Sequence, residues 1–173
     1  VGARMYYEDD TIQHAGVVIG FGGISVHCFV LQPRGTTGYF HRIICAQDYS
    51  AVTAACMMTK AEVFRQAGGF TEELAVAFND IDYCMKVRAL GKLVVYAPYA
   101  VMHHYESKSR GLEDTPEKVA RFNREVAVFA RRWPDILKNG DPYYNPNLTL
   151  RKSNFALRDL LKEKIGEPYK LEG

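Results

Sequence analysis

The clearest pattern of apolar positions lies between residues 115 and 134. Apolar side chains recur there at alternating steps of three and four, namely Val119, Phe122, Val126, Phe129 and Trp133. This spacing predicts an amphipathic helix that buries one face. Thr115 and Pro116 suit its first turn, and Pro134 marks its end. The size of the apolar side chains indicates that this helix packs against a substantial core.

Three further helices are expected, and two of them have recognisable boundaries. One covers residues 60–67, with Thr59 and Glu62 as a capping box. A second covers residues 81–90, preceded by Asn79 or Asp80 as the N-cap and followed by Gly91. A weaker helix is expected over residues 153–165.

Short extended segments separate these helices. They are expected at residues 1–7, 11–19, 51–58, 93–97 and 100–104. The first two should form a hairpin around the polar turn at residues 8–10, and Pro98 should end the fourth. Residues 20–39 are rich in glycine and should form a long loop. Helices interleaved with strands predict an α/β fold with a mixed sheet and C-terminal helices.

Composition narrows the class of protein. The 173 residues are 47% hydrophobic, which suits one compact domain or a large part of one, and the formal charge of +2 gives no reason to expect nucleic acid as a partner. The apolar stretch at residues 15–31 is interrupted by glycines, so no transmembrane segment is expected. The cysteines have no CxxC spacing and apolar neighbours, which indicates buried, reduced thiols and a cytoplasmic location. The chain begins with Val1 in a predicted strand, so we expect it to be cut from a longer polypeptide.

Two carboxylates lie at the start of the helix predicted over residues 81–90. Asp80 and Asp82 are two residues apart, where unpaired backbone N–H groups and the helix dipole favour an ionised carboxylate. Such a group can accept a proton from a hydroxyl group. The plainer alternative is that Asn79 or Asp80 only caps the helix and that Asp82 only binds first-turn N–H groups.

A second polar cluster follows the last predicted strand. His103 and His104 are adjacent, and Ser109 and Arg110 come shortly after them. Neighbouring strand residues point to opposite faces, so at most one histidine should face a given site. Imidazole can bind a divalent ion, and an arginine can bind phosphate oxygens. Histidines at strand ends that merely pack or face solvent are the alternative.

Taken in order, several segments resemble the inverting glycosyltransferases of family 2, which have the GT-A fold, and most closely their bacterial rhamnosyltransferase-like members. The segments are VGAR (1–4), TIQHAG (11–16), SAVTAAC (50–56), GGF (68–70), FNDIDYC (78–84), HHYES (103–107), SRG (109–111) and DPYYNPNL (141–148). The likeness spans most of the chain. It implies the C-terminal, acceptor-side half of the catalytic domain over residues 1–112 and a helical extension over residues 113–173.

The resemblance implies roles for individual residues. Asp80 matches the family's general base, which deprotonates the acceptor hydroxyl, and Asn79 stands where the family commonly has Glu. Asp82 belongs to the same acceptor-side motif. A divalent metal ion, Mn²⁺ or Mg²⁺, would bridge the donor diphosphate, with His104 as first choice of ligand and His103 as the alternative.

Further site residues follow from the same resemblance. Ala54 and Ala55 fall where small residues leave room for the donor sugar, and Ser109 and Arg110 would lie in the loop over the diphosphate. The implied partners are a nucleotide-sugar donor, dTDP- or UDP-linked and with rhamnose as one candidate sugar, and a glycan or lipid-linked glycan acceptor. A peripheral position at the inner face of the membrane is compatible with such an acceptor.

The resemblance also shows what the sequence lacks. The nucleotide-binding half, with its Asp-x-Asp metal segment, is absent from these residues, so the chain alone is expected to be inactive. Two other classes compete with the transferase hypothesis. A noncatalytic assembly or oligomerisation module would use the helix at residues 115–134. A metal-dependent hydrolase built on the histidines and aspartates is disfavoured because no HExxH-type pair is present.

Overall fold

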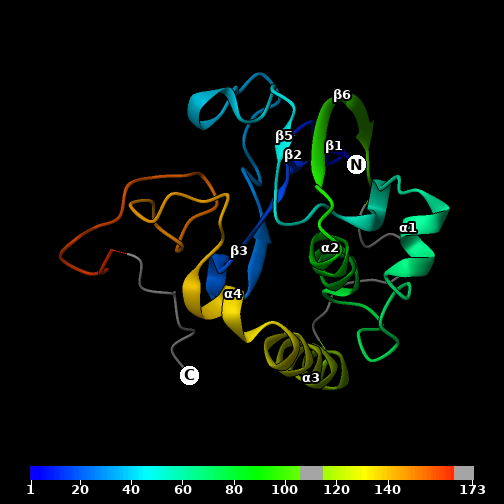
Figure 1. The fold of residues 1–173 in the computed structure, drawn as a ribbon. Coiled ribbons are helices and arrows are strands. Elements are labelled where there is room, and N and C mark those ends of the chain that lie inside the picture. The colour runs from blue at the N-terminus through cyan, green and yellow to red at the C-terminus, as the bar shows by residue number, and fades with distance from the viewer. Residues whose placement is uncertain (106–114, 166–173) are drawn as a thin grey trace.

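The computed structural model describes residues 1–105 and 115–165. A four-stranded sheet has the order β2-β1-β6-β5, and a separate two-stranded sheet pairs β3 with β4 (Figure 1). The strands are β1 (Gly2–Tyr6), β2 (Ile12–His14), β3 (Val17–Ile19), β4 (Ser25–His27), β5 (Gln47–Asp48) and β6 (Val95–His103). The central pair, β1 and β6, is parallel, and the other pairs are antiparallel. The predicted α/β class with a mixed sheet is therefore confirmed.

Helices occupy the middle and the C-terminal part of the chain. They are α1 (Ala61–Gln66), α2 (Asn79–Ala89), α3 (Pro116–Arg132) and α4 (Pro134–Asn139), with short 3-10 turns η1 (Phe21–Gly23), η2 (Tyr39–His41) and η3 (Ala54–Cys56). The α3 helix begins as predicted, because the Thr115 side chain accepts a hydrogen bond from the backbone N–H of Lys118. In the part of the chain that the structure describes, no helix is long and apolar enough to cross a membrane.

Two predicted helix caps are wrong. The N-cap of α2 is Phe78, in a left-handed conformation with φ 62°, so Asn79 and Asp80 lie within the first turn. The N-cap of α1 is Lys60, and no side chain caps that helix. The Thr59 hydroxyl instead pairs with the Tyr83 hydroxyl at 2.7 Å. This contact ties the start of α1 to α2 rather than to the helix's own N–H groups.

Two of the predicted extended segments also differ from the strands in the structure. Residues 51–58 form only isolated bridges, at Ala51 and Met57, because the Thr53 hydroxyl accepts from the Ala55 N–H and turns the chain into η3. The β6 strand continues through Pro98. Its register with β1 jumps from Ala97 to Val101, so Pro98 lies in a bulge where its missing N–H interrupts no ladder bond.

The apolar face of α3 is only partly buried. Phe129 is fully buried, and its ring centroid lies 5.5 Å from that of Phe78 at the start of α2. Phe122 is 43% exposed and contacts the same ring, while Val119 is 45% exposed. The predicted core stripe is therefore confirmed at its C-terminal end and not at its N-terminal end. Contacts between α3 and α2 cross the expected boundary near residue 112, and the division into two parts stays a prediction.

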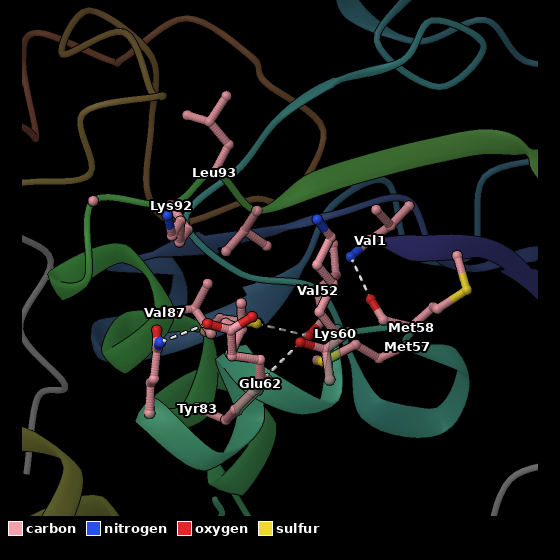
Figure 2. Close-up of a pocket in the computed structure, with 16 residues that line it drawn as sticks. Val1, Val52, Met57, Met58, Lys60, Glu62, Tyr83, Val87, Lys92 and Leu93 are labelled. Carbon is pink, nitrogen blue, oxygen red and sulfur yellow. Dashed lines mark hydrogen bonds between the residues drawn. The ribbon is translucent and has the colours of Figure 1, made fainter. Parts of the chain in front are cut away.

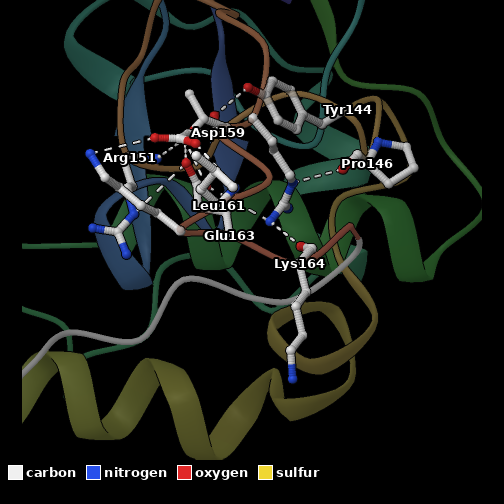
Figure 3. A network of polar contacts seen from close by, with 10 residues as sticks. Tyr144, Pro146, Arg151, Asp159, Leu161, Glu163 and Lys164 are labelled. Carbon is white, nitrogen blue, oxygen red and sulfur yellow. Dashed lines mark hydrogen bonds and ion pairs between the residues drawn. The ribbon is translucent and has the colours of Figure 1, made fainter.

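The segment after α4 has no helix among residues 153–165, contrary to the expectation. Local polar contacts set its path instead (Figure 3). The Glu163 carboxylate accepts from the Thr149 hydroxyl at 2.7 Å, and the Arg158 side chain donates to the carbonyls of Pro146 and Lys164, each at 2.8 Å. Phe155 stacks on Phe29 with ring centroids 4.7 Å apart, which fastens this segment to the core.

The thiols are free, and two of them are buried as expected. Burial raises the pKa of Cys28 above its ordinary value and that of Cys84 to about 12, so both stay protonated and unreactive at neutral pH. Cys45 is exposed and Cys56 is half-buried, so the expectation of burial is wrong for these two.

Candidate functional site

Asp80 lies in the first turn of α2 and is half-buried. Its Oδ2 accepts a hydrogen bond from the Ala54 N–H at 3.0 Å, and its Oδ1 accepts from the Ile81 N–H at 2.9 Å. Each carboxylate oxygen has two lone pairs, so one acceptor position remains on each oxygen. The two contacts fix the orientation of the carboxylate and leave it able to accept further hydrogen bonds. The structure thus joins the acidic motif to the segment that contains Ala54 and Ala55.

A cavity of about 300 Å³ lies beside this contact. Its lining comes from Tyr7, Gln13, Ser25, Val26, His27, Val30, Thr53, Ala55 and His104. Asp80 and Ala54 do not line it, but Thr53 and Ala55, the neighbours of Ala54 along the chain, do. Ala54 and Ala55 are both exposed. His104 therefore lines the cavity directly, and Asp80 is connected to its edge through the hydrogen bond from Ala54.

Gln13 fixes the orientation of His104. The Gln13 side-chain amide donates to the His104 carbonyl at 3.2 Å, and its Oε1 lies 2.9 Å from His104 Nδ1. A backbone carbonyl can only accept, so the amide NH₂ must face it and Oε1 must face the ring. Oε1 can only accept as well, so Nδ1 carries the hydrogen. The lone pair of neutral His104 is thereby on Nε2.

His103 has a different environment, as the alternation of strand side chains predicts. Its Nε2 lies 2.7 Å from Asp10 Oδ1, which also binds Arg34. The hydrogen bond with His103 and the one from Arg34 lower the pKa of Asp10. His103 does not line the cavity that His104 lines.

Asp82 is fully buried and holds α3 against α2. Its carboxylate accepts from the Thr71 hydroxyl at 2.6 Å, Arg132 Nε at 2.7 Å and Trp133 Nε1 at 2.8 Å. Burial by itself would raise the pKa of Asp82, but these hydrogen bonds outweigh burial and lower it. A carboxylate with no accessible surface cannot contact a ligand in this arrangement, so the structure gives Asp82 a role in packing. Asn79 is half-buried at the first position of α2.

Several residues near the site were missed by sequence reasoning. Glu125 on α3 is buried and accepts from the backbone N–H groups of Val76 and Ala77, the latter at 2.6 Å. It therefore fixes the loop that leads into Phe78 and Asp80. Gln13 and His27 were also missed. No spacing pattern marked them, because their partners lie far away in the sequence.

The predicted divalent metal ion has one suitable ligand, His104, among the predicted site residues that the structure describes. Within residues 1–105 and 115–165, no group of three or more His, Cys, Asp or Glu side chains could hold an ion. His104 fits as a single ligand, since its Nδ1–H is anchored and its Nε2 lone pair is available. Ser109 and Arg110, predicted at the diphosphate, lie outside the described residues.

A larger cavity of about 780 Å³ lies elsewhere, between α1, α2 and the start of β1 (Figure 2). Mostly apolar side chains line it, including Val1, Met58 and Leu93. None of the predicted site residues lines it. Its polar lining includes Glu62, Lys60, Lys92 and Tyr83, but no residue of the acidic motif or of the histidine cluster, so size alone does not connect it with the predicted chemistry.

Comparison with known proteins gives two relatives. The chain is 55% identical over 158 residues to "Uncharacterized protein y4gI" of Sinorhizobium fredii, and 35% identical over 159 residues to "O-antigen biosynthesis protein RfbC" of Myxococcus xanthus. Each alignment covers 91% of this chain. No family model matches the chain, and no solved structure matches it. The chain spans only 17% of the first relative and 12% of the second.

Proposed function

We propose that this chain is the acceptor-side part of a glycosyltransferase that acts in polysaccharide biosynthesis. The similarity to an O-antigen biosynthesis protein supports a role in making surface glycans. The resemblance to family 2 glycosyltransferases supports the finer assignment of sugar transfer with inversion from a nucleotide-sugar, with rhamnose as one candidate. The observation that carries the proposal is the hydrogen bond from the Ala54 N–H to Asp80, beside the cavity lined by His104.

Asp80 is assigned as the general base. It is half-buried at the N-terminal end of α2, towards which the positive end of the helix dipole points, and each oxygen retains one acceptor position. An acceptor hydroxyl that donates to Asp80 can therefore pass it a proton as the oxygen attacks the anomeric carbon. The exposed methyl groups of Ala54 and Ala55 leave space beside that carboxylate for a sugar ring.

His104 is assigned as a ligand of a divalent ion, Mn²⁺ or Mg²⁺. Such an ion, when bound, would neutralise charge on the leaving diphosphate. Gln13 would orient the His104 ring for this role through the contacts to Nδ1 and the carbonyl. The donor and parts of the longer polypeptide outside these residues would supply further ligands.

The test uses the full-length polypeptide with a nucleotide-sugar donor and a glycan acceptor. Ala55→Leu should remove most transfer, because the added side chain fills the cavity of about 300 Å³. Met58→Leu is the matched control, since Met58 lines the other cavity. Equal transfer by both variants would contradict the assignment of this cavity. The 173-residue chain alone should show no transfer, and detectable transfer would contradict the expected loss of the donor half.

A noncatalytic assembly module is the second candidate. The exposure of Val119 and Phe122 on α3 favours it, because these apolar side chains could contact another chain. Sedimentation of the wild type and of a Val119→Ser, Phe122→Ser variant separates the two functions. An oligomer that the substitutions dissociate, in a polypeptide with no transferase activity, would favour assembly.

A further inference from the structure

The cavity beside Ala55 contains a second imidazole that the proposed function does not use. His27, the last residue of β4, lines this cavity together with His104, which follows β6 directly. We propose that His27 and His104 bind one divalent transition-metal ion through their Nε2 atoms, with Gln13 as the residue that orients both rings. The inference rests on the proposed function for a metal ion at His104, adds His27 as a second protein ligand, and replaces Mn²⁺ or Mg²⁺ with an ion that imidazole prefers.

The orientation of His27 follows from its hydrogen bond to Gln13. His27 Nδ1 lies 3.0 Å from the Gln13 backbone carbonyl oxygen. A carbonyl only accepts, so Nδ1 carries the hydrogen and the lone pair of the neutral ring is on Nε2. His104 has the same tautomer, because its Nδ1 faces Gln13 Oε1. One residue therefore anchors both rings, through its carbonyl and through its side-chain Oε1.

This arrangement matches what metal-binding histidines require. A ligating imidazole commonly donates its other N–H to a carbonyl or amide oxygen, which fixes the ring and increases its basicity as a ligand. Both rings satisfy this condition, and neither Nε2 is used in a hydrogen bond given by the described residues. Both side chains are half-buried, so water can be displaced from the site without full exposure of the ion.

The side chains next to the two rings are compatible with a bound cation. His14 packs edge-on against His27, with ring centroids 4.7 Å apart and an interplanar angle of 81°. Among the described residues that line the cavity, none is lysine or arginine. The Ser25 hydroxyl is buried without a hydrogen-bond partner in the part of the chain that the structure describes. Because Ser25 also lines the cavity, its hydroxyl can accept from a metal-bound water.

Two imidazole ligands leave the remaining coordination positions to water or to substrate oxygens. Imidazole suits Co²⁺, Zn²⁺ and Ni²⁺ better than carboxylate-preferring Mg²⁺. The 173-residue chain should therefore bind one Co²⁺ or Zn²⁺ ion by isothermal titration, with a Co²⁺ absorption band as a second signal. His27→Ala and His104→Ala should each weaken binding at least tenfold, and the double variant should abolish it. Gln13→Ala should weaken it about 10- to 100-fold, as loss of an orienting partner does.

His41→Ala and His103→Ala are the matched controls, since neither histidine lines the cavity. Both should bind Co²⁺ as the wild type does. Paramagnetic shifts of the imidazole signals of His27 and His104 in the wild type test the site without substitution, so a poorly folding variant does not decide the result. No binding, unchanged affinity after loss of His27, or shifts at His104 alone would overturn the proposal.

The test of the metal site can fail or succeed independently of the test of the transferase assignment. Asp80→Asn should leave Co²⁺ affinity unchanged, because Asp80 does not line the cavity. Co²⁺ binding that depends on both histidines, in a full-length polypeptide that transfers no sugar, would refute the transferase assignment and retain the site. Sugar transfer that needs Asp80, with Co²⁺ binding indifferent to His27, would refute the site and retain the transferase.

Discussion

The buried carboxylate of Asp82 provides a sharp test of how α3 is held in place. Replacing Asp82 with Asn keeps the shape of the side chain and removes its charge. If Oδ1 still accepts from Arg132 and Trp133, the new NH₂ group faces the Thr71 hydroxyl and stands near Lys86 Nζ, which lies 3.3 Å from Oδ2 in the wild type. The variant therefore loses two charge-assisted interactions and weakens two hydrogen bonds.

The magnitude follows from these contacts. A hydrogen bond to a charged group contributes roughly 1.5–3 kcal/mol, and removing one member of a buried ion pair costs roughly 3–5 kcal/mol. Arg132 is partly exposed and can regain water, which reduces the loss. We expect Asp82→Asn to lower the free energy of unfolding by about 3 kcal/mol. With a slope of about 2 kcal/mol per molar urea, the midpoint should fall by about 1.5 M.

Urea unfolding followed by circular dichroism and by the fluorescence of Trp133, the single tryptophan, measures this change. Asp135→Asn is the matched control, because Asp135 is exposed in the first turn of α4 and its loss affects only the helix dipole, by about 1 kcal/mol or less. A loss below about 1 kcal/mol for Asp82→Asn would refute the argument that this carboxylate fastens α3 to α2.

Two further predictions concern stability. Gly16→Ala should lower the free energy of unfolding by about 3 kcal/mol, since an added Cβ would lie 2.4 Å from the Tyr49 ring at a φ of +96°. Gly140→Ala has a similar φ of +86° and no atom within 4 Å, so thermal unfolding should show a loss of only about 1 kcal/mol, and equal losses would contradict the steric argument. The lowered pKa of Asp82 adds stability that is present above about pH 4 and is lost as pH falls through the folded-state value. Urea unfolding at pH 5 and pH 3 should therefore show a smaller decline for Asp82→Asn than for the wild type, and equal declines would count against this linkage.

The parts of the fold that sequence reasoning predicted are those set by local signals. The hairpin at the start of the chain and the helix α3 have regular periodicity and recognisable ends. Pro98 misled the strand prediction because a bulge in the β1–β6 pairing, invisible in one sequence, accommodates it. The cap of α2 was missed for a related reason. Phe78 adopts its left-handed conformation where Glu125, from a distant helix, binds the preceding backbone.

In the candidate site, too, local sequence signals identified some residues and long-range contacts determine the roles of others. Asp80 and His104 were identified from motifs that are contiguous in the sequence. The position of His104 in the cavity and of Asp80 beside it depends on tertiary contacts, through Gln13 and through the Ala54 N–H. The roles of Gln13 and His27 arise only from these long-range hydrogen bonds, so no spacing pattern could have marked them. The sequence placed Asp82 in the same motif as Asp80 and near the bound acceptor, whereas the structure buries the Asp82 carboxylate completely.

The central claim is that Asp80 accepts the proton of the attacking hydroxyl. The most direct measurement compares turnover and donor affinity for wild-type and Asp80→Asn forms of the full-length polypeptide, under saturating acceptor. Loss of a general base should lower kcat by about 10²- to 10⁴-fold while the donor dissociation constant changes little. A kcat within a few-fold of the wild type, or a loss confined to donor binding, would contradict the account.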